Sequence, residues 1–366
     1  MIFQIFVVSI CSYGQFEYYI SEEESKTSSN IPNSSDYIPD SNTPIKYIRV
    51  NIHYMLRSPN HPDYPGNFTK TNDGNSNSNY TGYDYAEQLI KTANYRLSTN
   101  SQMHLPPNNS TNVIARKYRY VLNGVFFHEN NNYYFYPSIP NGTYGENKGE
   151  CINVFFNNSN GTVGGGHANM DGYRWVEIKG AWEKYLGDIG NGRGIETGLW
   201  VNAQTLNHEI GHNFSLKHTL LTGNGACANE DDYCSDTPSR NEIINNYSYD
   251  PCCDAWDENI ICSNNLMDYS GLDAITPEQL GRVHWTIENE IQEYKSCYFS
   301  NSTVNITSFT DNKSYIGENV YIPVGTSINI NNGNAMYINA EIFEIVGTIE
   351  VGANSMLIVN TLPKCN

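Results

Sequence analysis

The segment HEIGHNFSLKH, which begins at His208, brings three histidines and a glutamate into one short stretch. On a helix, His208 and His212 lie one turn apart on the same face, and imidazoles at that spacing can bind one zinc ion. Glu209 projects beside them and can reach a water at the metal without binding the metal itself. His218 can join the pair only if the helix ends soon after the second histidine and the chain turns back. The residue types therefore predict a zinc site with a carboxylate placed as general base.

The helix that carries this segment needs a second face for the core. Leu206, Ile210 and Phe214 recur every four residues and form an apolar stripe. His208 and His212 are displaced from that stripe by two positions, about 200° around the axis. We therefore expect the stripe to pack inward and the histidines to face a site, with the helix ending near Phe214.

Three further motifs follow the histidine segment. They are DDYCSDTP at 231–238, NNLMDYS at 264–270 and ITPEQLGRVH at 275–284. In order and spacing, the four motifs resemble the metzincin zinc proteases, whose long zinc motif HExxHxxGxxH precedes a methionine turn. The closest resemblance is to the pappalysin-like (cytophagalysin, M43) family. It is specific over 200–285, is weaker over 46–199 and does not extend to 298–366.

The resemblance implies a role for each matching residue. The three zinc ligands are His208, His212 and His218. Glu209 matches the general base, Met267 the methionine beneath the metal, and Tyr269 the tyrosine that steadies the tetrahedral intermediate. The implied fold class is α+β, with a metzincin-like catalytic domain that combines a twisted mixed sheet, a zinc-binding active-site helix and a Met-turn.

The resemblance also implies a second ion. The acidic motif matches a calcium-binding region of some family members, which nominates Asp232, the backbone of Cys234 and Thr237. A solvated acidic loop without an ion is the alternative.

These residue types predict hydrolysis of peptide bonds. Zinc held by three neutral imidazoles keeps a fourth position for water and lowers the pKa of that water towards 7. Glu209 takes the water's proton and delivers it to the leaving nitrogen, while zinc and the Tyr269 hydroxyl stabilise the oxyanion. The glycine-rich stretch 163–166 is a candidate site for the substrate as an added antiparallel strand, with a simple turn as the alternative. The prediction is a secreted zinc-dependent endopeptidase that acts on protein or peptide substrates.

Residue 215 departs from the family motif. Ser215 stands where the motif has glycine, and a serine with positive φ costs roughly 1 kcal/mol or more. Two alternatives stay open: a catalytically decayed scaffold that acts as an extracellular binding protein, and a two-histidine-plus-glutamate zinc site without His218.

It also stays open whether Leu272 or Asp273 lies near the S1′ pocket; leucine favours apolar residues there, and aspartate favours Arg or Lys. Asn213 lies in an Asn-Phe-Ser sequon, where a glycan would block the site.

The composition fits an exported protein and argues against nucleic acid as a partner. The chain has 39 acidic and 21 basic residues and a net charge of −18, whereas nucleic-acid binding rewards clustered Lys and Arg. No run beyond the N-terminus is long enough to span a bilayer.

Nine cysteines are present, and without Cys11 their even number and their density between 227 and 262 favour a disulfide framework, with a structural zinc cluster as the alternative. A bridge between Cys297 and Cys365 would bracket the C-terminal segment.

Composition divides the chain into four parts. An apolar run ending in small residues predicts a signal peptide over 1–14, with a start that lacks the usual positive residue and a buried strand as the alternative. Residues 15–45 are polar and turn-rich and predict a disordered linker. The metalloprotease domain is expected over 46–297. Over 298–366, short Ile- and Val-rich strands separated by glycines predict a small all-β module, either a sandwich or a β-helix. Strand-like runs in the catalytic part occur at 47–55, 117–129, 131–137, 151–156 and 173–178.

Overall fold

The computed structural model describes residues 34–106, 108–135, 141–158, 165–169, 172–190, 195–219, 232–247, 263–268 and 273–360. The predicted signal peptide over 1–14 and most of the predicted linker lie outside these residues. The described end of that linker holds a 3-10 helix, η1 (Ser34–Tyr37), which packs against helix α7 (Pro277–Asn289). The prediction of a disordered linker is therefore wrong for this part.

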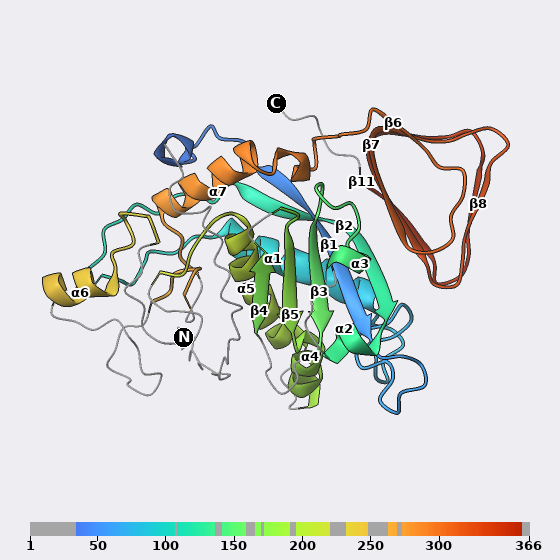
Figure 1. Cartoon of the computed structure of the whole chain (residues 1–366), viewed down its shortest axis with the longest axis horizontal. Coiled ribbons are helices and arrows are strands. Elements are labelled where there is room, and N and C mark those ends of the chain that lie inside the picture. The colour runs from blue at the N-terminus through green and yellow to red at the C-terminus, as the bar shows by residue number, and fades with distance from the viewer. Residues whose placement is uncertain are drawn as a thin grey trace, which may run out of the picture.

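A five-stranded mixed sheet lies at the centre of the catalytic part (Figure 1). Its strands are β1 (Lys46–Leu56), β2 (Tyr118–Glu129), β3 (Ile152–Asn157), β4 (Gly166–Asn169) and β5 (Trp175–Lys179), in the order β2-β1-β3-β5-β4. The first four strands in this order run parallel, and β4 pairs antiparallel to β5 at the edge. This edge strand lies against the helix that carries the histidine segment.

The alternating pattern of β1 explains how the sheet is buried. Ile48, Val50 and Ile52 belong to the main hydrophobic core, as their spacing predicts. The alternate positions are polar, yet Arg49, Asn51 and His53 are also fully buried. Both faces of this strand are therefore covered, as is usual for parallel strands.

Helices cover the apolar face of the sheet. Helices α1 (Gly82–Ser98) and α5 (Ile195–Asn213) pack against each other, and their apolar residues join the main core. The remaining short helices are α2 (Asn131–Phe135), α3 (Asn141–Tyr144), α4 (Ala181–Gly190), α6 (Arg240–Tyr247) and η2 (Gln292–Tyr294). In the part of the chain that the structure describes, no helix has the length and apolar character needed to cross a membrane.

The strand expected at 131–137 is wrong, because residues Asn131–Phe135 form helix α2. The side chain of Asn130 accepts hydrogen bonds from the backbone N–H groups of Asn132 and Tyr133. This is the capping pattern that favours a helix start over an extended chain. The local cap outweighs the aromatic composition that suggested a strand.

The C-terminal segment forms a parallel coil of short strands, seen nearly end-on as a triangle in Figure 1. Its strands are β6 (Thr303–Asn305), β7 (Lys313–Ile322), β8 (Ser327–Ile330), β9 (Ala335–Ile345), β10 (Thr348–Val351) and β11 (Met356–Asn360). One sheet has the order β11-β9-β7-β6, the other pairs β8 with β10, and every pair is parallel. Of the two arrangements expected from the sequence, the β-helix is the one that forms.

This β-helix packs directly on the edge of the catalytic sheet. Tyr337 of β9 belongs to the main hydrophobic core. Tyr83 of α1 donates a hydrogen bond to the Gly333 carbonyl at 2.8 Å, and Asn123 of β2 donates one to Ser314 Oγ at 2.6 Å.

The catalytic part, a twisted mixed sheet with a few helices, is compatible with the predicted metzincin-like domain.

Candidate metal centre

Helix α5 presents two of the three histidines to a common point. His208 Nδ1 lies 2.8 Å from the carbonyl oxygen of Leu266, and His212 Nδ1 lies 2.9 Å from that of Leu216. Because a carbonyl only accepts, each Nδ1 carries the proton and each Nε2 keeps a lone pair. Both lone pairs are therefore available to a metal.

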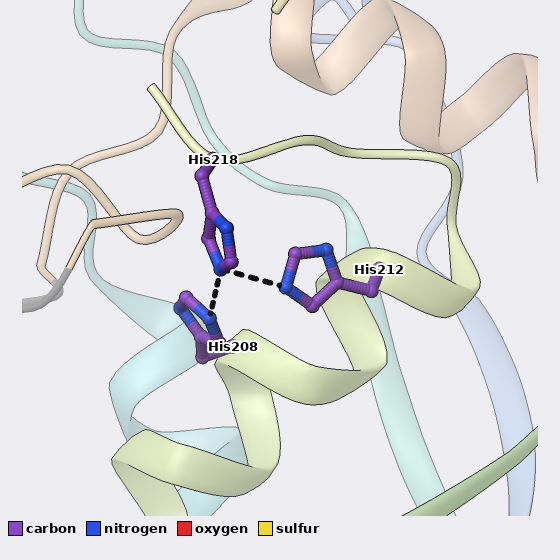
Figure 2. A group of neighbouring side chains, drawn as sticks. All are labelled: His208, His212 and His218. Carbon is purple, nitrogen blue, oxygen red and sulfur yellow. Dashed lines mark hydrogen bonds between the residues drawn. The ribbon is translucent and has the colours of Figure 1, made fainter. Parts of the chain in front are cut away.

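The third histidine completes the group (Figure 2). The Nε2 atom of His218 lies 3.2 Å from that of His208 and 3.1 Å from that of His212. Tetrahedral zinc with Zn–N distances of about 2.0–2.1 Å places its ligand nitrogens about 3.3–3.4 Å apart. One proton on His218 cannot serve two facing lone pairs, whereas a cation satisfies all three nitrogens. The donor set therefore fits zinc, and the predicted ligands His208, His212 and His218 do converge.

The electrostatic state of the three imidazoles suits a metal. Burial lowers the pKa of His208 to about 4 and, together with the neighbouring His208, lowers the pKa of His212 to about 3. Burial and both neighbouring histidines hold the pKa of His218 well below its usual range. All three rings are therefore neutral at pH 7, which is the form that binds zinc.

The turn between His212 and His218 takes the course that the third ligand requires. Helix α5 ends at Asn213, and Leu216 N–H then donates to the Gly211 carbonyl at 3.1 Å. Ser215 adopts a φ of 64°, the left-handed conformation that glycine supplies in the family motif. A serine in this conformation costs roughly 1–2 kcal/mol. The substitution has not displaced His218.

Glu209 is buried beside the edge strand. Its side chain is packed so closely against β4 that a β-carbon on Gly166 would lie 2.3 Å from Glu209 Oε1. Asn213, at the end of α5, donates from Nδ2 to the Asn169 carbonyl of β4 at 2.6 Å and is fully buried. The edge strand and the active-site helix are thus fixed together, and the sequon at Asn213 is closed to glycosylation in the folded chain.

Met267, the predicted Met-turn residue, packs against the turn of α5 that carries Gly211. It is fully buried, and a β-carbon on Gly211 would lie 2.6 Å from its sulfur. Its backbone carbonyl accepts a hydrogen bond from Thr219 N–H at 3.3 Å, next to the third ligand. Tyr269, the predicted oxyanion-stabilising residue, lies outside the described residues.

The three residues nominated for calcium lie together. Thr237 Oγ1 is 2.7 Å from both carboxylate oxygens of Asp232 and 2.9 Å from the carbonyl of Cys234. Cys234 N–H also donates to Asp232 at 3.1 Å. Within the described residues, the three histidines are the one group of three or more His, Cys, Asp or Glu side chains close enough to share a metal ion, which leaves a site built from a backbone carbonyl and a threonine untested. Calcium at 232–237 therefore stays a prediction.

Asp273, one of the two candidates for the S1′ pocket, is engaged elsewhere. Its carboxylate forms an ion pair with Arg96 of α1 at 2.7 Å, and its carbonyl accepts from Arg116 at 2.6 Å. Leu272, the other candidate, lies outside the described residues. The structure thus gives Asp273 a place in the scaffold.

The cysteines only partly follow the expected framework. Cys151 and Cys234 are free and buried, so the prediction of disulfides is wrong for these two. Burial raises the pKa of each thiol, which keeps both unreactive. Cys297 is disulfide-bonded. Its predicted partner Cys365 lies outside the described residues, as do Cys11, Cys227, Cys252, Cys253 and Cys262.

Comparison with known proteins decides the family. Residues 145–288 match the Peptidase_M43 family model, described as pregnancy-associated plasma protein-A. This part of the chain belongs to the M43 peptidase family. The match extends from β3 to α7 and includes the histidine segment and residues 263–268 around Met267, here called the Met loop. A comparison with curated proteins finds no match.

Membership of the M43 family gives the chain a coarse activity. It is a metallopeptidase of a zinc-dependent family, and its substrates are peptides. The M43 motifs led directly to the histidines, Glu209 and Met267. They did not reveal the roles of Gly166 and Gly211, where a side chain would collide with Glu209 and Met267. The sequence held a signal for each, because Gly166 ends a triple-glycine run and Gly211 lies inside the zinc motif.

Proposed function

We infer that the chain is a secreted zinc endopeptidase in which His208, His212 and His218 hold the metal. The observation that carries this proposal is the convergence of three Nε2 atoms, with two Nδ1 atoms held by backbone carbonyls. Such carbonyl partners orient metal-binding imidazoles and raise their basicity. The geometry favours this three-histidine site over the two-histidine-plus-glutamate alternative.

The chemistry follows from the neighbouring residues. Zinc, when bound, supplies a Lewis acid that polarises the peptide carbonyl and makes water nucleophilic near neutral pH. Glu209 is placed on the helix turn that also carries His208 and His212, and its carboxylate accepts the proton of the attacking water. It then donates that proton to the leaving nitrogen. By resemblance to the family, Tyr269 donates a hydrogen bond to the developing oxyanion.

The edge strand is the proposed substrate platform. In the described residues, β4 pairs with β5 on one side only, so its other edge can add an antiparallel peptide strand. Gly166 at the start of β4 packs against Glu209. A peptide paired along β4 is thereby brought next to the catalytic carboxylate.

The competing proposal is a binding protein on a decayed protease scaffold, which Ser215 motivates. Metal analysis combined with casein or gelatin hydrolysis separates the two. We expect about one zinc per chain and cleavage that a chelator abolishes. Glu209→Ala should keep the zinc and lose the cleavage, because the carboxylate is not a ligand. Zinc bound without chelator-sensitive cleavage by the wild type would favour the binding protein.

Three further features of the proposal rest on sequence alone. The N-terminal segment 1–14 is proposed to direct secretion, which N-terminal sequencing of the exported protein tests. Asp232, Cys234 and Thr237 are proposed to bind calcium, which isothermal titration on zinc-loaded protein tests. The bridge from Cys297 to Cys365 is tested by peptide mapping without reduction, and a free thiol at Cys365 would exclude it.

A further inference from the structure

Helix α7 is hydrogen-bonded to the turn that delivers the third histidine. Arg282 donates to the Ser215 carbonyl from Nε at 3.2 Å and from Nη2 at 2.9 Å. One turn later on the same helix, Thr286 Oγ1 donates to the Phe214 carbonyl at 3.2 Å. Two consecutive carbonyls directly after α5 are thus held by side chains from a helix that carries none of the three histidines.

The turn depends on its exact backbone course. Leu216, the residue after Ser215, supplies the carbonyl that orients His212, and His218 follows two residues later. Ser215 holds the left-handed φ of 64° against the preference of a side-chain-bearing residue. A relaxation of Ser215 towards negative φ would turn its carbonyl away and shift both ligands. A contact that fixes this carbonyl therefore acts on two of the three histidines.

Arg282 is suited to fix it. The residue is 2% exposed, so water competes little for the hydrogen bonds of its guanidinium. A charged donor also makes a stronger hydrogen bond to a carbonyl than a neutral donor does. Its planar fork points two N–H groups at one acceptor, which defines the direction of that carbonyl.

Helix α7 gives Arg282 a rigid base. The helix begins with a capping box between Thr276 and Gln279, and Leu280, Val283 and Ile287 are fully buried in the main core. A displacement of the Arg282 backbone would require movement of this anchored helix. The point from which the guanidinium reaches the turn is therefore set independently of the metal.

We propose that Arg282 is a positioning residue for the metal centre, holding the Ser215 turn in the conformation that glycine adopts without help. The proposal rests on the proposed zinc site for its consequence in catalysis. It also explains how a serine at 215 coexists with an assembled third ligand. Arg282 also contacts the Tyr233 ring, with Cζ 5.8 Å from the ring centroid.

Arg49 offers a matched control. It is likewise a fully buried arginine that donates to backbone carbonyls, those of Glu293 and Ser296, each at 3.0 Å. On β1 its side chain points to the face opposite Ile48 and Val50 and contacts η2, away from the Ser215 turn. Arg49→Met should therefore lower stability without touching the turn.

The experiment measures zinc affinity in the full-length chain, with cobalt(II) absorption as a second readout of ligand number. We expect Arg282→Met to weaken zinc binding by about 10- to 100-fold and to weaken the cobalt bands. Arg282→Lys keeps the charge but loses the fork, so its zinc affinity should lie between those of the wild type and Arg282→Met. Arg49→Met should bind zinc as the wild type does.

Ser215→Gly provides the decisive comparison. Because glycine adopts positive φ without strain, Ser215→Gly/Arg282→Met should recover most of the zinc affinity that Arg282→Met alone loses. Two results would overturn this inference alone. One is that the Arg282 variants bind zinc as tightly as the wild type. The other is that the Arg282 variants lose zinc affinity by the same factor whether position 215 holds serine or glycine. Failure of the wild type to bind zinc would overturn the proposed function as well. If Arg282→Met does not fold, Arg282→Lys with and without Ser215→Gly gives the same comparison.

Discussion

Gly211 and Met267 pack so closely that a β-carbon on Gly211 would lie 2.6 Å from the Met267 sulfur. Gly211 lies on α5 directly before His212, and Leu266, the neighbour of Met267, orients His208 through its carbonyl. The Met loop can therefore reach the histidines only because residue 211 has no side chain. This requirement explains a glycine inside a helix, where it ordinarily costs about 1 kcal/mol relative to alanine.

Gly211→Ala is expected to lower the free energy of unfolding by about 1–3 kcal/mol, because the new methyl group overpacks a filled site. It should also weaken zinc binding, since displacement of Met267 moves the Leu266 carbonyl. Urea unfolding and zinc titration measure the two effects. Gly187→Ala on α4 is the control, because nothing lies within 4 Å of its new β-carbon. A Gly211→Ala protein as stable as the control variant would contradict the prediction.

Gly166→Ala is expected to impair catalysis without removing the metal. A β-carbon there would lie 2.3 Å from Oε1 and 2.4 Å from Cγ of Glu209, so the carboxylate must leave its position. We expect kcat to fall about 10- to 100-fold, at or below the roughly 100- to 10,000-fold that a general base contributes, because the carboxylate is displaced and not removed. Zinc content should stay unchanged because Glu209 is not a ligand.

Peptide hydrolysis and metal analysis of the same Gly166→Ala preparation check this prediction. Gly142→Ala is the control, since its β-carbon meets nothing within 4 Å. Unchanged kcat in Gly166→Ala would show that Glu209 tolerates the methyl group by a small shift, and the close packing would then have no role in catalysis.

The histidine cluster could be predicted because its signal is local. His208 and His212 lie one helical turn apart, and the offset to His218 belongs to a known motif, so short-range geometry was sufficient. The apolar stripe of Leu206 and Ile210 was equally readable, and both residues are fully buried. Residues whose role depends on spacing within one element are the ones that a single sequence reveals.

The supporting contacts could not be predicted because they join distant segments. Arg282 acts on Ser215 across 67 positions. Gly166 and Asn213 acquire their roles only when β4 lies beside α5.

Asp273→Asn is expected to leave cleavage specificity unchanged. The carboxylate pairs with the buried guanidinium of Arg96, so it serves the scaffold and does not offer its charge to a substrate. Loss of that pair should reduce stability by about 1–2 kcal/mol, because Arg96 stays buried with a weaker partner. A peptide library and thermal unfolding measure the two properties. A selective loss of cleavage before Arg or Lys would instead place Asp273 in the S1′ pocket.

The zinc-free protein is expected to lose stability as the pH falls below about 6.5, the usual pKa of histidine. Folding lowers the pKa of His208 to about 4 and that of His212 to about 3. Between these values and 6.5 the unfolded chain binds more protons than the folded chain, so the free energy of unfolding rises with pH in this window. Each histidine contributes a slope of up to about 1.4 kcal/mol per pH unit.

Urea unfolding of zinc-free protein at pH 7.5, 6 and 5 tests this dependence. Other buried histidines with lowered pKa values, including His128 and His284, add to the total slope. The variant His208→Asn/His212→Asn isolates the share of the metal centre, since its stability should fall less steeply with acid than that of the wild type. Zinc should flatten the wild-type curve down to the pH at which protons displace the metal. Parallel slopes for wild type and variant would mean that the two rings accept protons in the folded state as readily as in the unfolded chain.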